Sequence, residues 1–504
     1  MTTKLSILSI ICLFILLECK GATSVQLPKI TDKQEVITSP FTSIEVSSAK
    51  ELLQAIDQLI PGTCILLEDG RYNNINLNIT AKAPVDKPIT LKAKNPGQVQ
   101  FTGDFHWTIS GDHIEVSGIH FTKGTRKADN DLILDKGQYN QYNNCKFNNL
   151  NDVTGTFIKL EGQYTRVEQC AFTGKTTGAS YINMDVPKAG GCYHFIKRNY
   201  FSRPPLGKNG GSAMRVGHGS MAMHHAYITI EENLFENCDG ESEIVSVKSS
   251  RNYIRNNTFR SCKGAFSLRQ GRGSIFEGNF FIGDGKKQCG GLTIRGRDHF
   301  VFNNYFYNLK SKKSGIINFG VASPEDPERI KLGVYPRHFP LTQDIIICHN
   351  TIIANHSSCH INFLEGYGTR NRFDLPVNIQ FYNNVFDSAQ QFMDAKPNMD
   401  LSFETNYYAG KNLSMEGIIP FTLKTYQKQE LVLPVDHSAF VNQSSALPVA
   451  QPHYNNFEKR DLNIDKDIQW NQRDAEKDPG CFELGQTAST QNRPLKKDDV
   501  GCDF

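Results

Sequence analysis

The chain has 504 residues, of which 39% are hydrophobic and 21% are charged, and its formal net charge is +3. This length allows a large core or several domains, and the composition excludes a disordered chain. So small a charge for this length gives no basis for nucleic-acid binding.

The N-terminal segment has the pattern of a secretory signal. Lys4 precedes the apolar run from Leu5 to Leu17, and the small residues Gly21 and Ala22 follow. Because this run is too short to span a bilayer, we expect residues 1–21 to be a signal peptide and the protein to be secreted or periplasmic. No later stretch reaches 18 apolar residues, which predicts no membrane span. The 13 cysteines lack C-x-x-C spacing, so buried thiols are expected, with one or two disulfides left open.

The first predicted elements lie at residues 47–93. Residues 47–59 are amphipathic and begin with serines, which predicts a short helix that closes the N-terminal end of a core. The apolar, β-branched runs at 63–67 and 89–93 are predicted to be the first strands.

A repeat follows from about residue 113. Each unit has a β-branched or aromatic run, one or two polar residues that are commonly Asn, and then an apolar residue that is usually Phe, as in the segments that end at Phe147, Phe172, Phe235 and Phe259. The usual interval is about 25 residues, which is a solenoid period, and longer intervals indicate inserted loops. Strand-type residues dominate, so we predict an all-β, single-stranded, right-handed parallel β-helix with internal Phe stacks and an Asn ladder.

The repeat places polar side chains from three coils on one outer patch. Counted from each coil's Phe, Asn209 and Glu243 have the same phase, and Glu241 and Arg269 fall within two residues of it. Residues of equal phase are vertical neighbours in a stacked solenoid, at roughly 4.8 Å per coil. Lys248 has the opposite parity from the two glutamates, so it reaches the patch only around a bend or bulge. The insertion at 217–225 is a candidate wall for this cleft.

These residue types suit chemistry on an anionic sugar polymer. Two carboxylates and an amide oxygen form part of an oxygen cage, which favours Ca²⁺ over Zn²⁺. The metal would acidify the proton beside a uronate carboxylate, and Lys248 with a lowered pKa would remove it, leading to β-elimination. Arg269 stabilises the developing charge more readily than it donates a proton, because its pKa exceeds ~12. Arg215 and Arg295, on flanking coils, are candidates to bind substrate carboxylates.

Several longer segments resemble polysaccharide lyase family 6, which contains alginate lyases and chondroitinase B. They are the runs at 203–217, 241–249, 257–271, 277–281 and 493–501. The resemblance implies that Asn209, Glu241 and Glu243 are Ca²⁺ ligands, that Lys248 is the general base and that Arg269 is the residue assigned as general acid. The chain departs from the family at Gln270, where the family usually has His, and at Ser212-Ala213, where it has Glu-Thr.

We therefore expect a signal peptide at 1–21, a catalytic β-helix at 22–395 and an irregular C-terminal cover at 396–504. The expected function is that of a monomeric, secreted, calcium-dependent lyase that cleaves uronate-containing polysaccharide, with alginate as the first candidate. A chondroitin or dermatan sulfate lyase, with Arg370 and Arg372 available for sulfates, is one alternative. A non-catalytic, polysaccharide-binding β-solenoid is another.

Overall fold

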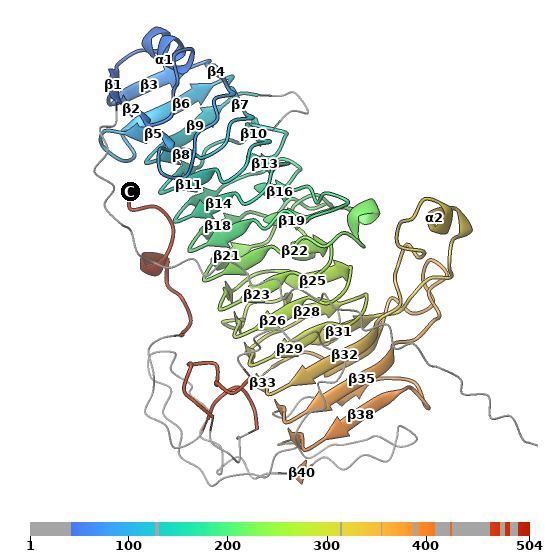
Figure 1. The fold of residues 1–504 in the computed structure, drawn as a ribbon. Helices are drawn as coiled ribbons and strands as arrows, with labels where there is room; N and C mark the ends of the chain where they lie inside the picture. Colours follow the sequence, from blue (N-terminus) through green and yellow to red (C-terminus); the bar gives the residue numbers. More distant parts are fainter. Residues whose placement is uncertain are drawn as a thin grey trace, which may run out of the picture. The chain divides into compact units, whose positions relative to one another are not determined.

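Strands from successive turns of the chain stack in parallel to form three sheets (Figure 1). The computed structural model describes residues 42–126, 131–312, 315–353, 355–386, 391–408, 424–425, 464–473, 479–483 and 492–504. The expected signal peptide at 1–21 lies outside the described residues. No described helix is long and apolar enough to cross a membrane. The predicted right-handed parallel β-helix is confirmed.

Most coils contribute one strand to each sheet. Within the described residues, the first sheet has 14 strands, in spatial order β1 (Thr42–Val46), β2 (Thr63–Leu67), β5 (Ile89–Ala93), β8 (Ile114–Ser117), β11 (Gln141–Asn143), β14 (Arg166–Glu168), β17 (Phe195–Lys197), β20 (Thr229–Glu231), β23 (Tyr253–Arg255), β26 (Ile275–Glu277), β29 (Phe300–Phe302), β32 (Gln343–Cys348), β35 (Val377–Tyr382) and β38 (Leu401–Glu404). The second described sheet also has 14, namely β3 (Gly70–Asn73), β6 (Val99–Gly103), β9 (His120–Gly124), β12 (Lys146–Phe147), β15 (Ala171–Thr173), β18 (Tyr200–Arg203), β21 (Leu234–Cys238), β24 (Thr258–Arg260), β27 (Phe280–Ile282), β30 (Tyr305–Tyr307), β33 (Thr351–Ile353), β36 (Val385–Phe386), β39 (Tyr407–Tyr408) and β40 (Lys424–Thr425).

The third sheet carries the candidate site. Its 12 described strands are β4 (Asn76–Ile79), β7 (His106–Ile109), β10 (Ile133–Asp135), β13 (Ile158–Leu160), β16 (Ile182–Met184), β19 (Met214–Val216), β22 (Glu243–Lys248), β25 (Gly264–Gln270), β28 (Cys289–Ile294), β31 (Ile317–Gly320), β34 (Cys359–Glu365) and β37 (Gln391–Asp394). The described helices are α1 (Ala49–Ile56) and α2 (Pro327–Lys331), with short 3₁₀ turns η1 (Gly219–Met221) and η2 (Lys497–Asp499).

The repeated Phe and Asn positions form two internal columns. Rings at the repeated Phe position stack at centroid distances of 4.4–5.1 Å, in the order Phe121, Phe147, Phe172, Phe201, Phe235, Phe259, Phe281 and Phe306. Eight buried amides form a ladder in which each Nδ2 donates to the next Oδ1 at 2.8–3.0 Å, in the order Asn199, Asn233, Asn257, Asn279, Asn304, Asn350, Asn384 and Asn406. The predicted stack and ladder are thus present, and both fix the vertical register of the coils.

The two ends of the chain cover the coils differently. The predicted cap helix is α1, where the Ser48 side chain accepts a hydrogen bond from the amide of Glu51 and Leu52 is fully buried. Coil strands continue beyond residue 395, through β38 and β39. The last described segment runs back along the coils (Figure 1): the amide of Leu495 donates to Thr258, and that of Gly501 donates to the Arg198 carbonyl.

Candidate active site

A β-bulge in β22 brings Lys248 to the same face as the glutamates. Glu243 pairs with Ala265, but Val245 pairs with Phe266, so Ile244 has no partner of its own. An unpaired extra residue reverses the alternation of side chains along a strand. Glu243 on one side of the bulge and Lys248 on the other therefore face the same cleft, which resolves the parity conflict in the way that the sequence required.

Backbone contact between two loops positions Glu241. A Cβ on Gly211 would collide with the backbone of Gly240, so these residues must be small for the two loops to meet. The Glu241 carboxylate accepts hydrogen bonds from the amide of Gly210 at 3.2 Å and from the amide of Ser212 at 2.9 Å. The loop that carries Asn209 is thereby joined to the carboxylate on the next coil.

Arg203 fixes the same loop from inside. Its guanidinium is fully buried and lies 5.1 Å from the centre of the Tyr181 ring. It donates to the carbonyls of Ser212 and Thr177, each at 2.8 Å, and to that of Gly210 at 3.4 Å. One buried cation therefore holds two loops that border the cleft.

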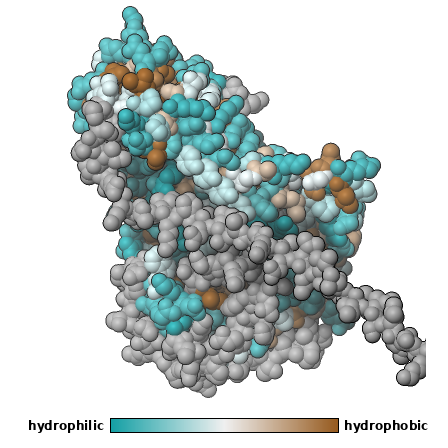
Figure 2. All heavy atoms as spheres, viewed as in Figure 1, coloured by the Kyte–Doolittle hydropathy of each residue, from teal (hydrophilic) through white to brown (hydrophobic). Residues whose placement is uncertain are grey.

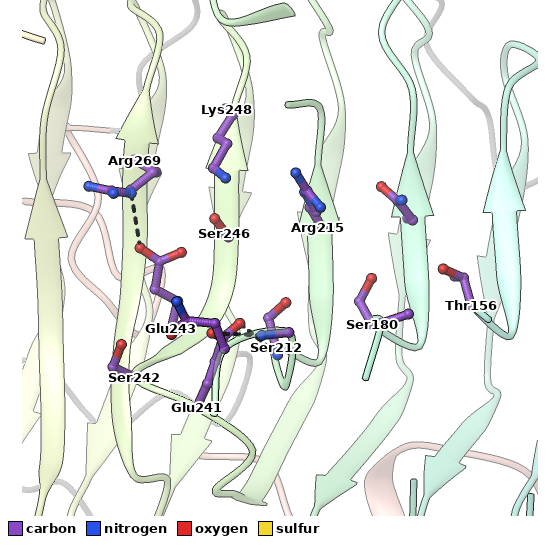
Figure 3. A pocket seen from close by; sticks show the side chains of 14 residues that line it. Thr156, Ser180, Ser212, Arg215, Glu241, Ser242, Glu243, Ser246, Lys248 and Arg269 are labelled. Atoms are coloured by element: carbon purple, nitrogen blue, oxygen red, sulfur yellow. Dashed lines mark hydrogen bonds and ion pairs between the residues drawn. The ribbon is translucent and has the colours of Figure 1, made fainter. Parts of the chain in front are cut away.

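The cleft has a volume of about 360 Å³ and is lined by Thr156, Ala179, Ser180, Asn183, Asn209, Gly210, Ser212, Arg215, Glu241, Ser242, Glu243, Ser246, Lys248 and Arg269. Six of the seven residues predicted for the site are in this list. Figure 3 shows Glu241 and Glu243 close together, Lys248 on the same strand as Glu243, Arg269 at one end of the cleft and Thr156 at the other. The equal-phase argument predicted one patch of Asn209, Glu241, Glu243 and Arg269, and the structure brings these four together with Lys248 and Arg215.

The charges of the cleft perturb one another. Burial raises the pKa of Glu241, and the neighbouring Glu243 raises it further, because two close carboxylates resist ionising together. Burial lowers the pKa of Lys248, Arg215 lowers it further, and Glu243 partly opposes both effects. Lys248 is thus closer to losing its proton at neutral pH than an exposed lysine.

Arg269 is an electrostatic partner of the acidic pair. Its Nε lies 3.3 Å from Glu243 Oε1, and both side chains are about one-fifth exposed (Figure 3). Ser267 Oγ donates to the same carboxylate oxygen at 3.3 Å. The guanidinium therefore lies within the cleft, next to a carboxylate whose orientation it helps to set.

The donor set fits a hard cation with an incomplete protein shell. Two carboxylates and the Asn209 amide border one cavity, and their mutual repulsion, seen in the raised pKa of Glu241, is what a divalent cation would relieve. Among the described residues, no group of three or more His, Cys, Asp or Glu could hold a metal. An ion here would need water or substrate oxygens to complete its coordination, a pattern of Ca²⁺ and Mg²⁺ and not of structural Zn²⁺.

Arg295 is the exception among the predicted site residues. It is only 2% exposed, it does not line the cleft, and it pairs with Glu365 beneath the Phe339 ring. Burial lowers its pKa to about 10. This placement corrects the expectation that Arg295 contacts substrate directly. The phase gave the outward direction of Arg295 but could not show that Phe339 covers it.

The expected wall at 217–225 is also absent from the cleft lining, whereas Asn209, Gly210, Ser212 and Arg215, which precede it, are part of the lining. Conversely, the sequence argument missed the hydroxyl and amide side chains of Thr156, Ser180, Asn183 and Ser246. Asn183 pairs with Arg215 and Arg215 with Ser246 in register. Asn183 and Ser246 each lie 11 residues after their coil's Phe, so phase could have identified these two, but Arg215 lies 14 residues after Phe201 and its register with them is not evident from the sequence.

Fold and site together define a parallel β-helix protein with an elongated, charged cleft on the outer face of one sheet. The model of the family described as chondroitinase B matches residues 46–440. The chain therefore belongs to the chondroitinase B family, as its sequence motifs indicated. No curated protein matches the sequence significantly.

Solved structures share the architecture. The PL6 family alginate lyase AlyGC has a TM-score of 0.70 at 24% identity, over 92% of this chain and 58% of that one. A mannuronic acid specific polysaccharide family 6 lyase from human gut microbiota has a TM-score of 0.66 at 23% identity, over 77% and 91% of the two chains. A PL6 family polysaccharide lyase from Pseudopedobacter saltans has 0.65 at 21%, over 92% and 99%. These likenesses show the fold, and the present chain spans 58% of the length of AlyGC.

Proposed function

We propose that this protein is a calcium-dependent polysaccharide lyase that cleaves uronate-containing polysaccharide by β-elimination, and that it is secreted. The observation that carries the proposal is Lys248, whose pKa is lowered, in one cleft with Arg269 and an acidic pair. Such a base beside a cation site and a second cation is suited to removing a weakly acidic proton next to a carboxylate.

The proposed reaction assigns separate roles to the metal ligands and to the base. Bound Ca²⁺ would neutralise the substrate carboxylate and acidify the adjacent C–H. The residues that would hold it are Asn209, Glu241 and Glu243. The neutral amine of Lys248 takes the proton at C5. The C5–H electrons then form the C4–C5 double bond, the C4–O4 bond breaks, and O4 leaves with its electron pair and takes a proton.

Two cleft arginines stabilise charge during this reaction. Arg269, next to Glu243, stabilises the negative charge that develops as the proton leaves. Arg215 points into the cleft beside Lys248 and has no ion-pair partner among the described residues, so it is available to a second substrate carboxylate. No Tyr or His of the described residues lines the cleft, which leaves the proton for O4 to a water molecule or to a residue at the rim.

Alginate is the first substrate to test, because it is a pure polyuronate and because two of the similar structures are described as alginate or mannuronic acid lyases. The family description, chondroitinase B, makes dermatan and chondroitin sulfate the alternative. Arg372 is buried against Glu365 and Phe339, whereas Arg370 is exposed, so only Arg370 is free to meet a sulfate.

The test is to incubate the purified protein with each polymer in calcium and to follow the ultraviolet absorbance of the unsaturated product. We expect absorbance to rise with alginate, to stop with a chelator and to be lost in Lys248→Ala. A rise only with dermatan sulfate would change the substrate. No rise with any uronate polymer would refute the lyase, and polymer binding that survives Lys248→Ala without any turnover in the wild type would identify a binding protein.

A further inference from the structure

The cleft is asymmetric along the coil stack. Its lining extends over successive coils from Thr156 to Arg269, with Arg269 on the last of these coils and the proposed base Lys248 on the coil before it (Figure 3). Adjacent coils are about 4.8 Å apart, so several sugars of an extended chain fit on the Thr156 side of Lys248. On the other side the lining stops at Arg269.

The next coils are covered at the same outward positions. Arg295, one coil beyond Arg269, is 2% exposed, and Thr293 and Asn318 are fully buried. Asn183, Arg215 and Ser246, which are in register on earlier coils, line the cleft, whereas Thr293, Asn318 and Arg295 do not. The groove available to a polymer therefore ends at the coil of Arg269.

Two loops close this end, and we call them the end wall: residues 321–342, which include α2, and residues 366–376. Three guanidiniums lie 4.5–5.5 Å from the centre of the Phe339 ring, those of Arg269, Arg295 and Arg372. Gln270 Nε2 donates to the His338 carbonyl at 3.1 Å. Phe339 and His338 are thus placed directly against the coil of Arg269.

The end wall is held by contacts that leave it little freedom. The amide of Phe339 donates to Ser323 Oγ at 3.2 Å, and the amide of Ser323 donates to the Phe339 carbonyl at 3.1 Å. The two loops are joined because the amide of Ala322 donates to the Asp374 carbonyl at 2.9 Å. The outer part of the end wall, around α2, projects from the coils. Figure 2 shows an apolar patch there, where Leu332 is 75% exposed. The base of the wall is therefore a fixed boundary.

We propose that the end wall makes the cleft a dead end, so that the protein removes sugars from a terminus of the polyuronate chain, with His338 contacting the terminal sugar. This inference rests on the proposed lyase function and specifies its mode of action. A polymer that continued past the reacting sugar in both directions would have to cross the position of Phe339, which is packed against three guanidiniums.

The charges at the closed end support a terminal anionic sugar. The His338 ring is exposed and packs edge-on against Phe339 at 4.9 Å. Burial lowers the pKa of His338, and so do nearby cations, which are Arg269, Arg329, Arg370 and Lys248. The neighbouring charges that lower this pKa most are all cations, so an anionic sugar would offset positive charge there. The largely neutral imidazole can still exchange hydrogen bonds with sugar hydroxyls.

The first experiment compares viscosity with unsaturated product during digestion of alginate, or of whichever uronate polymer the protein cleaves. Removal from a terminus predicts that viscosity falls slowly relative to the number of bonds broken and that products of one small size are present from the earliest times. Early formation of many intermediate sizes, with a collapse of viscosity, would overturn the dead end and leave the lyase function intact. Absence of any absorbance rise would instead refute the lyase function.

Two variants locate the effect in the wall. His338→Ala/Phe339→Ala should release intermediate product sizes that the wild type does not make. Because removal of Phe339 can affect folding, His338→Ala alone is the second variant, with an expected about three- to tenfold rise in KM for short oligosaccharides and a retained kcat. Val85→Ser, at a 76% exposed position near the N-terminal coils, is the control and should match the wild type. An unchanged KM in His338→Ala would remove His338 from the proposal.

Discussion

Arg203 offers a demanding test, because it contacts none of the proposed reacting atoms yet should control the proposed metal site. In Arg203→Met the carbonyls of Ser212, Thr177 and Gly210 lose their buried donor. A buried carbonyl without a donor costs about 1–3 kcal/mol, so loss of the two shortest bonds costs about 2–6 kcal/mol. Part of this cost falls on the loop that carries Asn209.

We expect calcium binding to weaken about 10- to 100-fold in Arg203→Met, which corresponds to about 1.4–2.8 kcal/mol. The measurement is isothermal titration of calcium into metal-free protein, with circular dichroism to confirm the fold. Arg203→Lys retains the charge but cannot bond several carbonyls in the same fork, so its affinity should lie between those of the wild type and Arg203→Met.

Lys175→Met is the matched control. Lys175 is also a fully buried basic side chain next to these loops, but it donates to Val153, Gly155 and Thr177, and not to the loop at 209–212. Its loss should lower the free energy of unfolding while leaving calcium affinity within about threefold, because a change of under 0.7 kcal/mol is expected at a site it does not contact. Equal calcium affinities in the wild type and in Arg203→Met, with only stability reduced, would refute the positioning role.

Further variants separate the roles of the remaining groups. Lys248→Ala should lower kcat at least ~10²-fold, the usual worth of a positioned base, with an unchanged circular dichroism spectrum. Glu243→Gln should raise the calcium concentration needed for half-maximal rate, and added calcium should restore part of the activity. If a chelator leaves the rate of the wild type unchanged, calcium is not part of the reaction. Arg215→Gln removes a cation that lowers the pKa of Lys248. That pKa should rise, so the limb over which kcat increases with pH should move to higher pH, and an unmoved limb would count against Lys248 as the base. Asn257→Ala breaks both neighbouring rungs of the amide ladder, and urea unfolding should show a loss of about 2–4 kcal/mol, larger than that of Asn406→Ala at the last described rung.

The interior of the β-helix was predictable because its stacking and hydrogen-bonding contacts recur once per coil, with the same period as the sequence repeat. The side-chain amide of Asn257 bonds to those of its vertical neighbours Asn233 and Asn279, so an Asn at a given phase favours another Asn on the next coil. Phe259 likewise packs between Phe235 and Phe281 at 4.8 and 4.4 Å. Sequence phase therefore carries real spatial information inside the stack.

The same reasoning explains how much of the site could be predicted. Glu243 and Arg269 lie on β22 and β25, and Asn209 lies on the loop before β19; for these three, phase gave the coil and the outward direction. Lys248 needed one more fact, the bulge at Ile244, which the sequence signalled only as a parity conflict. The conflict was informative because Lys248 and the two glutamates can act on one substrate only if they face the same cleft. One unpaired bulge residue brings them to the same face and disrupts the strand pairing only locally.

Arg295 shows that the phase of a residue in the repeat does not predict its exposure. Its outward direction was correct, but exposure depends on what lies above the coil, and here that is Phe339 from an insertion without a repeat. A solenoid specifies the positions of its side chains through contacts between neighbours, whereas an insertion of this length is placed by contacts distant in sequence, such as that of Gln270 with His338. The repeat therefore positions the groups of the proposed reaction, whereas the end wall determines the proposed access to them. Product size is accordingly the proposed property for which the structure adds most to the sequence.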